Sequence, residues 1–135
     1  MKTSAGWMCL LALLGRPTLA ADPAMVEREV WLCKGVTQSA PGEPLQPEAR
    51  RLEFDFTSGD LLMSVGTSQY RTRFQASPRH YEAMFNLTLE GGVQVTESLH
   101  LIRAKGQITA TARTADGRQM RLFRSNCHPE GVPEK

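Results

Sequence analysis

The fold is decided by residues 79–127, which read RHYEAMFNLTLEGGVQVTESLHLIRAKGQITATARTADGRQMRLFRSNC. Apolar and polar side chains alternate along most of this stretch, and Gly-Gly, Lys-Gly and Asp-Gly pairs interrupt the alternation. A period of two places each set of side chains on one face of a strand, and glycine-containing pairs of this kind favour tight turns. The stretch therefore predicts an antiparallel β-meander.

The alternation is regular enough to predict how the two strands around Gly91-Gly92 pair. The apolar row of residues 81–89 resumes at Val93, with Met84 and Glu97 as the exceptions to the alternation. A two-residue turn would set apolar side chains opposite polar ones, because a one-residue slip inverts both faces. A three-residue turn through residues 90–92 makes the apolar rows coincide, and glycine tolerates the positive φ that this turn requires. In this register Glu97, inside an apolar row, marks a bulge or a barrel end.

About eight strands are predicted in all. They span approximately residues 30–36, 52–56, 61–65, 70–74, 81–89, 93–102, 108–113 and 119–127. Up-and-down order with cysteines near both ends predicts an all-β fold, a small antiparallel barrel or barrel-like meander, and a two-sheet β-sandwich is the alternative. The register of the last strand stays open, because Met120 and Leu122 share one face and Phe123 takes the other. Residues 22–30 fit either a short helical turn or the start of the first strand.

The N-terminus has the features of a processing signal. Lys2 precedes an apolar run over residues 7–14, and residues 18–20 offer small side chains at the cleavage positions. The run is too short to cross a bilayer, so a cleaved secretory signal and no stable membrane anchor are expected. The predicted organisation is a signal peptide at 1–20, a single β-domain at 21–128 with a proline-rich loop at 38–50, and a disordered tail at 129–135.

The mature chain holds two cysteines, Cys33 and Cys127, near its two ends. In an oxidising compartment such a pair forms a bridge more often than two free thiols. A Cys-x-x-Cys pair, as a catalytic dithiol would require, is absent from the sequence. We therefore expect a structural disulfide in a protein that is periplasmic or secreted.

Charge is distributed unevenly along the mature chain. Loss of residues 1–20 leaves 14 basic and 14 acidic residues, and the acids are concentrated before residue 70. The chain contains no dense Lys/Arg cluster, so nucleic acid is not expected as a partner. Arg71 and Arg73 share one face of a predicted strand and Arg79 follows the next turn, which makes these three the candidate contacts for a partner.

One polar cluster is the candidate for chemistry. The predicted register places Glu82 opposite His100, with His80 diagonal to it on the same face. Ser98 would face Met84 instead of His100, and same-face neighbours along a strand lie roughly 6.5 Å apart, beyond hydrogen-bond reach. No Gly-x-Ser-x-Gly motif and no zinc-ligand spacing occurs in the sequence. A solvent-exposed ion pair is therefore expected, with a metal site and a catalytic site as alternatives, and no cofactor is predicted.

These features favour a binding protein over an enzyme. Export, a bridged scaffold, uneven charge and a proline-rich loop are typical of a domain that holds a protein partner, as an inhibitor, immunity or accessory protein would. One alternative is a barrel that binds a small apolar ligand. A second alternative is a hydrolase using His100 and Glu82, which no motif supports.

Overall fold

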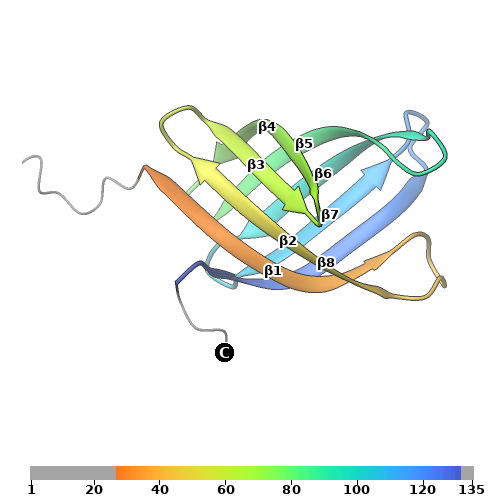
Figure 1. The fold of residues 1–135 in the computed structure, drawn as a ribbon, viewed down its shortest axis with the longest axis horizontal. Coiled ribbons are helices and arrows are strands. Elements are labelled where there is room, and N and C mark those ends of the chain that lie inside the picture. Colours follow the sequence, from red (N-terminus) through yellow and green to blue (C-terminus); the bar gives the residue numbers. More distant parts are fainter. Residues whose placement is uncertain (1–26, 132–135) are drawn as a thin grey trace, which may run out of the picture.

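The computed structural model describes residues 27–131, which form a closed barrel (Figure 1). Its strands are β1 (Arg28–Gln38), β2 (Gln46–Asp55), β3 (Asp60–Val65), β4 (Ser68–Ala76), β5 (His80–Thr88), β6 (Gln94–Ile102), β7 (Gln107–Arg113) and β8 (Gln119–Pro129). Each strand pairs antiparallel with the next, and β8 returns to pair with β1. The predicted barrel is confirmed, and the sandwich alternative is wrong.

The predicted signal peptide and the question of a helical turn near Asp22 lie outside the described residues. Arg28 and Glu29 belong to β1, so the part of residues 22–30 that the structure describes is mostly strand. Within residues 27–131 no helix is long and apolar enough to cross a membrane.

The hairpin of β5 and β6 has the predicted register. Tyr81 lies opposite Leu101, and Leu87 lies opposite Val95. The Leu89 N–H donates to the Val93 carbonyl at 2.8 Å, which closes the turn after residues 90–92. Gly91 and Gly92 have φ values of 88° and 83°, a conformation that side chains with a Cβ rarely adopt. The coincidence of the two apolar rows was therefore a sufficient guide to this register.

Inward-facing side chains fill the barrel. The largest fully buried apolar ones are those of Tyr81, Phe54, Phe123, Leu52, Leu61, Met63, Leu99, Leu101 and Ile108. The Phe54 ring lies 4.4 Å from the Tyr81 ring and 5.0 Å from the Phe74 ring, centroid to centroid. Phe123 faces inward opposite Ala110, so it is Phe123 that fixes the register of β8.

Glu97 lies inside the barrel and is fully buried. Its carboxylate accepts two hydrogen bonds from the buried guanidinium of Arg50, at 2.6 and 3.1 Å, and one from Arg121 at 3.0 Å. The pairing of β5 with β6 continues without a shift through Glu97, so the predicted bulge at this residue is wrong, and a register shift occurs instead between Ala112 and Arg113 where β7 pairs with β8. Glu97 is thus an internal ion-pair partner and does not mark an end of the barrel.

A second polar contact lies near the end of the barrel where β1 begins. One Glu29 carboxylate oxygen accepts hydrogen bonds from Trp31 Nε1 at 2.6 Å and from the Tyr81 hydroxyl at 3.0 Å. Burial, with the adjacent Glu29 carboxylate, raises the pKa of Tyr81. The Arg103 guanidinium covers the Tyr81 ring at 4.8 Å, so side chains also close this part of the interior.

The predicted disulfide joins Cys33 of β1 to Cys127 of β8. The two residues lie directly opposite each other where the first and last strands pair, with their Cα atoms 4.2 Å apart. Figure 1 shows these two strands side by side, β1 in orange and β8 in blue. The bond therefore clamps the seam that closes the barrel, and it is consistent with an oxidising compartment.

Two predicted boundaries need correction. β2 begins at Gln46, so the connection between β1 and β2 covers residues 39–45 instead of 38–50. Pro47 pairs with Val36, and it is tolerated because β2 has no partner on its β3 side before Arg50. At the other end, Pro129 belongs to β8 and the Glu130 N–H donates to the Val30 carbonyl at 2.8 Å. The predicted tail is therefore ordered at its start, and residues 132–135 lie outside the described residues.

Candidate binding surface

The barrel has one short seam, between β4 and β5. These strands pair over three positions, Phe74 with Ala83, Gln75 with Glu82 and Ala76 with Tyr81. In the described chain this pairing does not extend to residues 68–73 of β4 or to residues 84–88 of β5. A side chain partly bridges the gap, because the Thr72 hydroxyl donates to the Met84 carbonyl at 2.8 Å. Parts of the β4 and β5 edges along this seam therefore lack a strand partner, whereas strand edges at the other seams of the barrel are paired over longer stretches.

A groove of about 480 Å³ follows this seam on the outside of the barrel. Its lining includes Arg73 and Gln75 of β4, Glu82 and Met84 of β5, and Ser98 and His100 of β6. Met84 is 61% exposed, which makes it the most exposed large apolar side chain among residues 27–131. An exposed apolar side chain in a surface groove is the kind of feature that marks a contact site for a partner.

The three candidate arginines do not act as one group. Arg71 and Arg73 project from the outer face of β4 and share one acid, Asp60, at 3.6 and 3.8 Å. Arg79 is exposed in the turn between β4 and β5, and its backbone carbonyl accepts a hydrogen bond from the Arg103 N–H. Because one carboxylate faces two guanidinium groups, the outer face of β4 carries a net positive charge beside the groove, whose own lining holds one arginine, Arg73, and one acid, Glu82.

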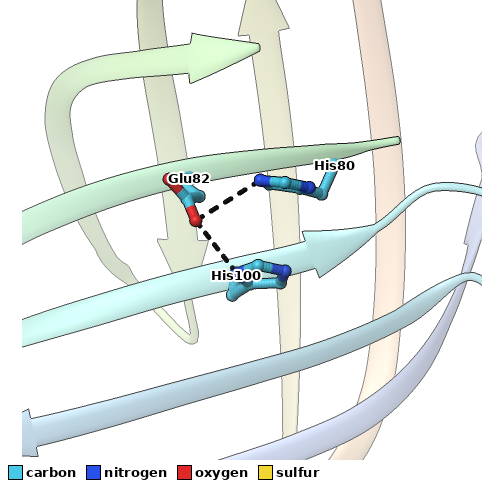
Figure 2. Close-up of side chains that lie close together, drawn as sticks. All are labelled: His80, Glu82 and His100. Carbon is cyan, nitrogen blue, oxygen red and sulfur yellow. Dashed lines mark ion pairs between the residues drawn. The ribbon is translucent and has the colours of Figure 1, made fainter. Parts of the chain in front are cut away.

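The polar cluster forms as the predicted register requires (Figure 2). Glu82 lies opposite His100, and its Oε1 is 3.2 Å from His100 Nδ1 and 3.4 Å from His80 Nε2. The two imidazole rings stack, with centroids 4.5 Å apart and planes at 19°. Ser77 Oγ lies 3.3 Å from the other ring nitrogen of His80, Nδ1. Strands β5 and β6 thus gather two imidazoles and one carboxylate at the surface.

This cluster is not arranged as a hydrolase triad. Ser98 lies opposite Met84, as predicted, and not opposite His100. The acid contacts both histidines with the same oxygen, whereas a triad needs a histidine between the acid and the nucleophile. The arrangement suits an ion pair or a metal ligand set better than nucleophilic attack.

Sequence reasoning missed two parts of this architecture. Arg50 heads the inward row of β2 just before Leu52 and Phe54, and a lone arginine there together with the lone Glu97 of β6 was a usable signal for a buried pair. The groove had a weaker signal, which was Met84 in an otherwise polar row. The short pairing of β4 with β5 left no mark in the alternation.

The exposed cluster is not expected to stabilise the fold. Replacing both Glu82 and His100 with alanine should change the free energy of unfolding by less than about 1 kcal/mol, because partly exposed ion pairs contribute little in water. Urea denaturation of the double variant beside the wild-type domain measures this change. A loss above about 3 kcal/mol would contradict the expectation, since that size belongs to buried pairs.

No protein-family model matches this chain, and neither a curated protein nor a solved structure is significantly similar to it. The function is therefore inferred from the site itself.

Proposed function

We propose that this chain is an exported, non-enzymatic binding protein that engages a protein partner in the periplasm or outside the cell. The observation that carries the proposal is the groove along the β4–β5 seam, where unpaired strand edges, the exposed Met84 and the positive outer face of β4 occur together. The disulfide that clamps the barrel supports an oxidising location.

The seam has the properties of a site for an extended segment of a partner. A strand laid along an unpaired edge gains main-chain hydrogen bonds, and side-chain contacts then give specificity. Met84 would supply the apolar contact, and Arg71 and Arg73 would favour a partner with acidic residues. Charge of this kind accelerates association and makes it sensitive to salt.

The two alternatives receive less support. A small apolar ligand would need space inside the barrel, which the aromatic core and the Arg50–Glu97 pair fill. A hydrolase would need a nucleophile in contact with His100, and Ser98 projects from a different paired position. Binding through the outer surface requires neither condition.

We expect the double variant Arg71→Glu/Arg73→Glu to lose capture of the partner while the barrel stays folded. Mature protein fixed to a resin is exposed to periplasmic extract at low and at high salt, and the retained proteins are compared among variants. The matched control is Arg113→Glu/Arg118→Glu, which makes the same change in charge at exposed positions outside the groove. Capture should fall for the first pair, persist for the second, and weaken as salt rises.

Met84→Glu tests the apolar part of the same surface and should also abolish capture. Equal capture by all variants would place the partner elsewhere on the barrel and overturn the proposed surface. Turnover in a broad hydrolase screen that His100→Ala abolishes, with no partner retained at any salt, would falsify the binding function itself.

A further inference from the structure

Three potential metal-binding atoms meet at the exposed cluster described above. One ring nitrogen of His80, one of His100 and one carboxylate oxygen of Glu82 all lie within 4.8 Å of one another. Glu82 Oε1 itself is 3.4 Å from His80 Nε2 and 3.2 Å from His100 Nδ1. Ligand atoms about 2.0–2.1 Å from a tetrahedral zinc ion lie roughly 3.3–3.4 Å apart. The two contacts with the carboxylate therefore already match this geometry.

We infer that His80, Glu82 and His100 form a binding site for a divalent transition metal, with zinc as the ion that this ligand set suits best. Two imidazoles and one carboxylate are common protein ligands of zinc, and a three-ligand set leaves a position for water or a further ligand. The side chains are 35%, 51% and 44% exposed, so this position is open to solvent. The inference goes beyond the proposed binding function and does not depend on it.

The sheet holds the ligands in place before the ion arrives. Glu82 and His100 are direct partners across β5 and β6, and His80 lies two residues before Glu82 on the same face. Both histidines lie beside the same carboxylate oxygen, and at least one of the stacked imidazole rings has to rotate about its side-chain bonds so that both nitrogens face the ion. Little chain entropy has to be lost on binding, because the strands have already fixed the backbone.

Ser77 adds a contact that zinc-bound histidines usually have. Metal-bound imidazoles commonly donate their other ring N–H to an oxygen atom, which fixes the tautomer and the ring orientation. Ser77 Oγ lies 3.3 Å from His80 Nδ1 and so can accept this hydrogen bond, leaving Nε2 free to bind the ion. The same hydroxyl oxygen accepts a hydrogen bond from the His80 backbone N–H at 3.1 Å, so the turn itself positions it.

The directly paired neighbours do not compete with the ion for the ligands. Across the seam Glu82 lies opposite Gln75, and on the other side His100 lies opposite Thr109. Both side chains are uncharged, so the carboxylate has no cation at its paired position on β4. In the described part of the chain both cysteines are disulfide-bonded, so free thiolates do not offer a stronger site for zinc.

The inference is tested by titrating the mature domain, without an affinity tag, with zinc chloride in an isothermal titration calorimeter at neutral pH. One equivalent should bind to the wild type, and His80→Ala, Glu82→Gln and His100→Ala should each weaken binding by about tenfold or more. His128→Ala is the matched control and should bind as the wild type does, because His128 lies on β8 opposite Leu32, outside the cluster. Circular dichroism verifies that each variant is folded.

A second readout separates a site from non-specific binding. In NMR spectra of the wild type, one equivalent of zinc should shift the ring resonances of His80 and His100 and leave those of His128 unchanged. Cobalt(II), added as a spectroscopic probe, should give the visible absorption of a tetrahedral or five-coordinate ion. Failure to saturate with millimolar zinc, or equal binding by the His100→Ala and His128→Ala variants, would overturn the inference.

Discussion

Replacing Glu97 with alanine should lower the free energy of unfolding by about 3–5 kcal/mol, because the change leaves a buried guanidinium without its main partner. Glu97 and Arg50 are both fully buried, and two hydrogen bonds of 2.6 and 3.1 Å join them. Arg50 also donates to Glu48 at 2.7 Å and lies 4.2 Å from the centre of the Phe123 ring. Glu48 still forms an ion pair with Arg50 Nε, but Arg50 Nη1 and Nη2 lose their carboxylate acceptors inside the barrel.

Chemical denaturation of wild type and variants measures this effect, and Glu82→Ala is the matched control because it removes an exposed glutamate from the neighbouring strand. The double variant Arg50→Met/Glu97→Leu should be far less destabilised than the two single changes predict together, since apolar side chains replace both charges at once. A loss below about 1 kcal/mol for Glu97→Ala would mean that water reaches Arg50 and that the interior is more open than described.

The same pair should make stability depend on pH. Burial raises the pKa of Glu97, but hydrogen bonds and positive charge from Arg50, and then from Arg121, outweigh burial and hold the pKa below its usual value. A carboxylate with a lowered folded pKa stabilises fully above its ordinary pKa of about 4.3, and this contribution is lost as the pH falls through the lower folded value. Acid unfolding of wild type should therefore be steeper than that of Arg50→Met/Glu97→Leu.

Removing the disulfide should have an effect of similar size. Cys33 and Cys127 are separated by 94 positions, and on the chain-entropy model a bridge across such a span contributes up to about 4–5 kcal/mol. Cys33→Ala should therefore lower the melting temperature by several degrees or more, and reduction of the wild type should do the same. The bond joins the strands that close the barrel, so its loss frees both ends of the sheet.

Thiol counting under denaturing, non-reducing conditions provides the direct check. Mature wild-type protein should show no free thiol, and two titratable thiols would contradict the expectation. A Cys33→Ala/Cys127→Ala double variant controls for the lone cysteine that the single change leaves behind. Equal melting temperatures for this variant and the wild type would show that strand pairing alone closes the barrel.

The sequence by itself determined the hairpin, the disulfide pairing and the exposed cluster. Strand side chains repeat every two residues, so matching two apolar rows was enough to place Tyr81 opposite Leu101 and Glu82 opposite His100. Once the predicted signal peptide with Cys9 is set aside, two cysteines are left near the ends of an up-and-down sheet, and they can pair only with each other. These results follow from the two-residue repeat of side chains along a strand and from the number of cysteines, and both are visible in the linear sequence.

Only the tertiary structure decided the features that depend on contacts across the barrel. Arg50 and Glu97 are 47 residues apart in the sequence. Each is a charged residue in an otherwise apolar row of its own strand, and only closure of the barrel brings the two buried side chains into contact. The short β4–β5 seam and its groove depend on how far two neighbouring strands pair, and the alternation within one strand does not specify this. Local periodicity specifies which face a side chain takes, whereas barrel closure specifies which distant side chain it meets.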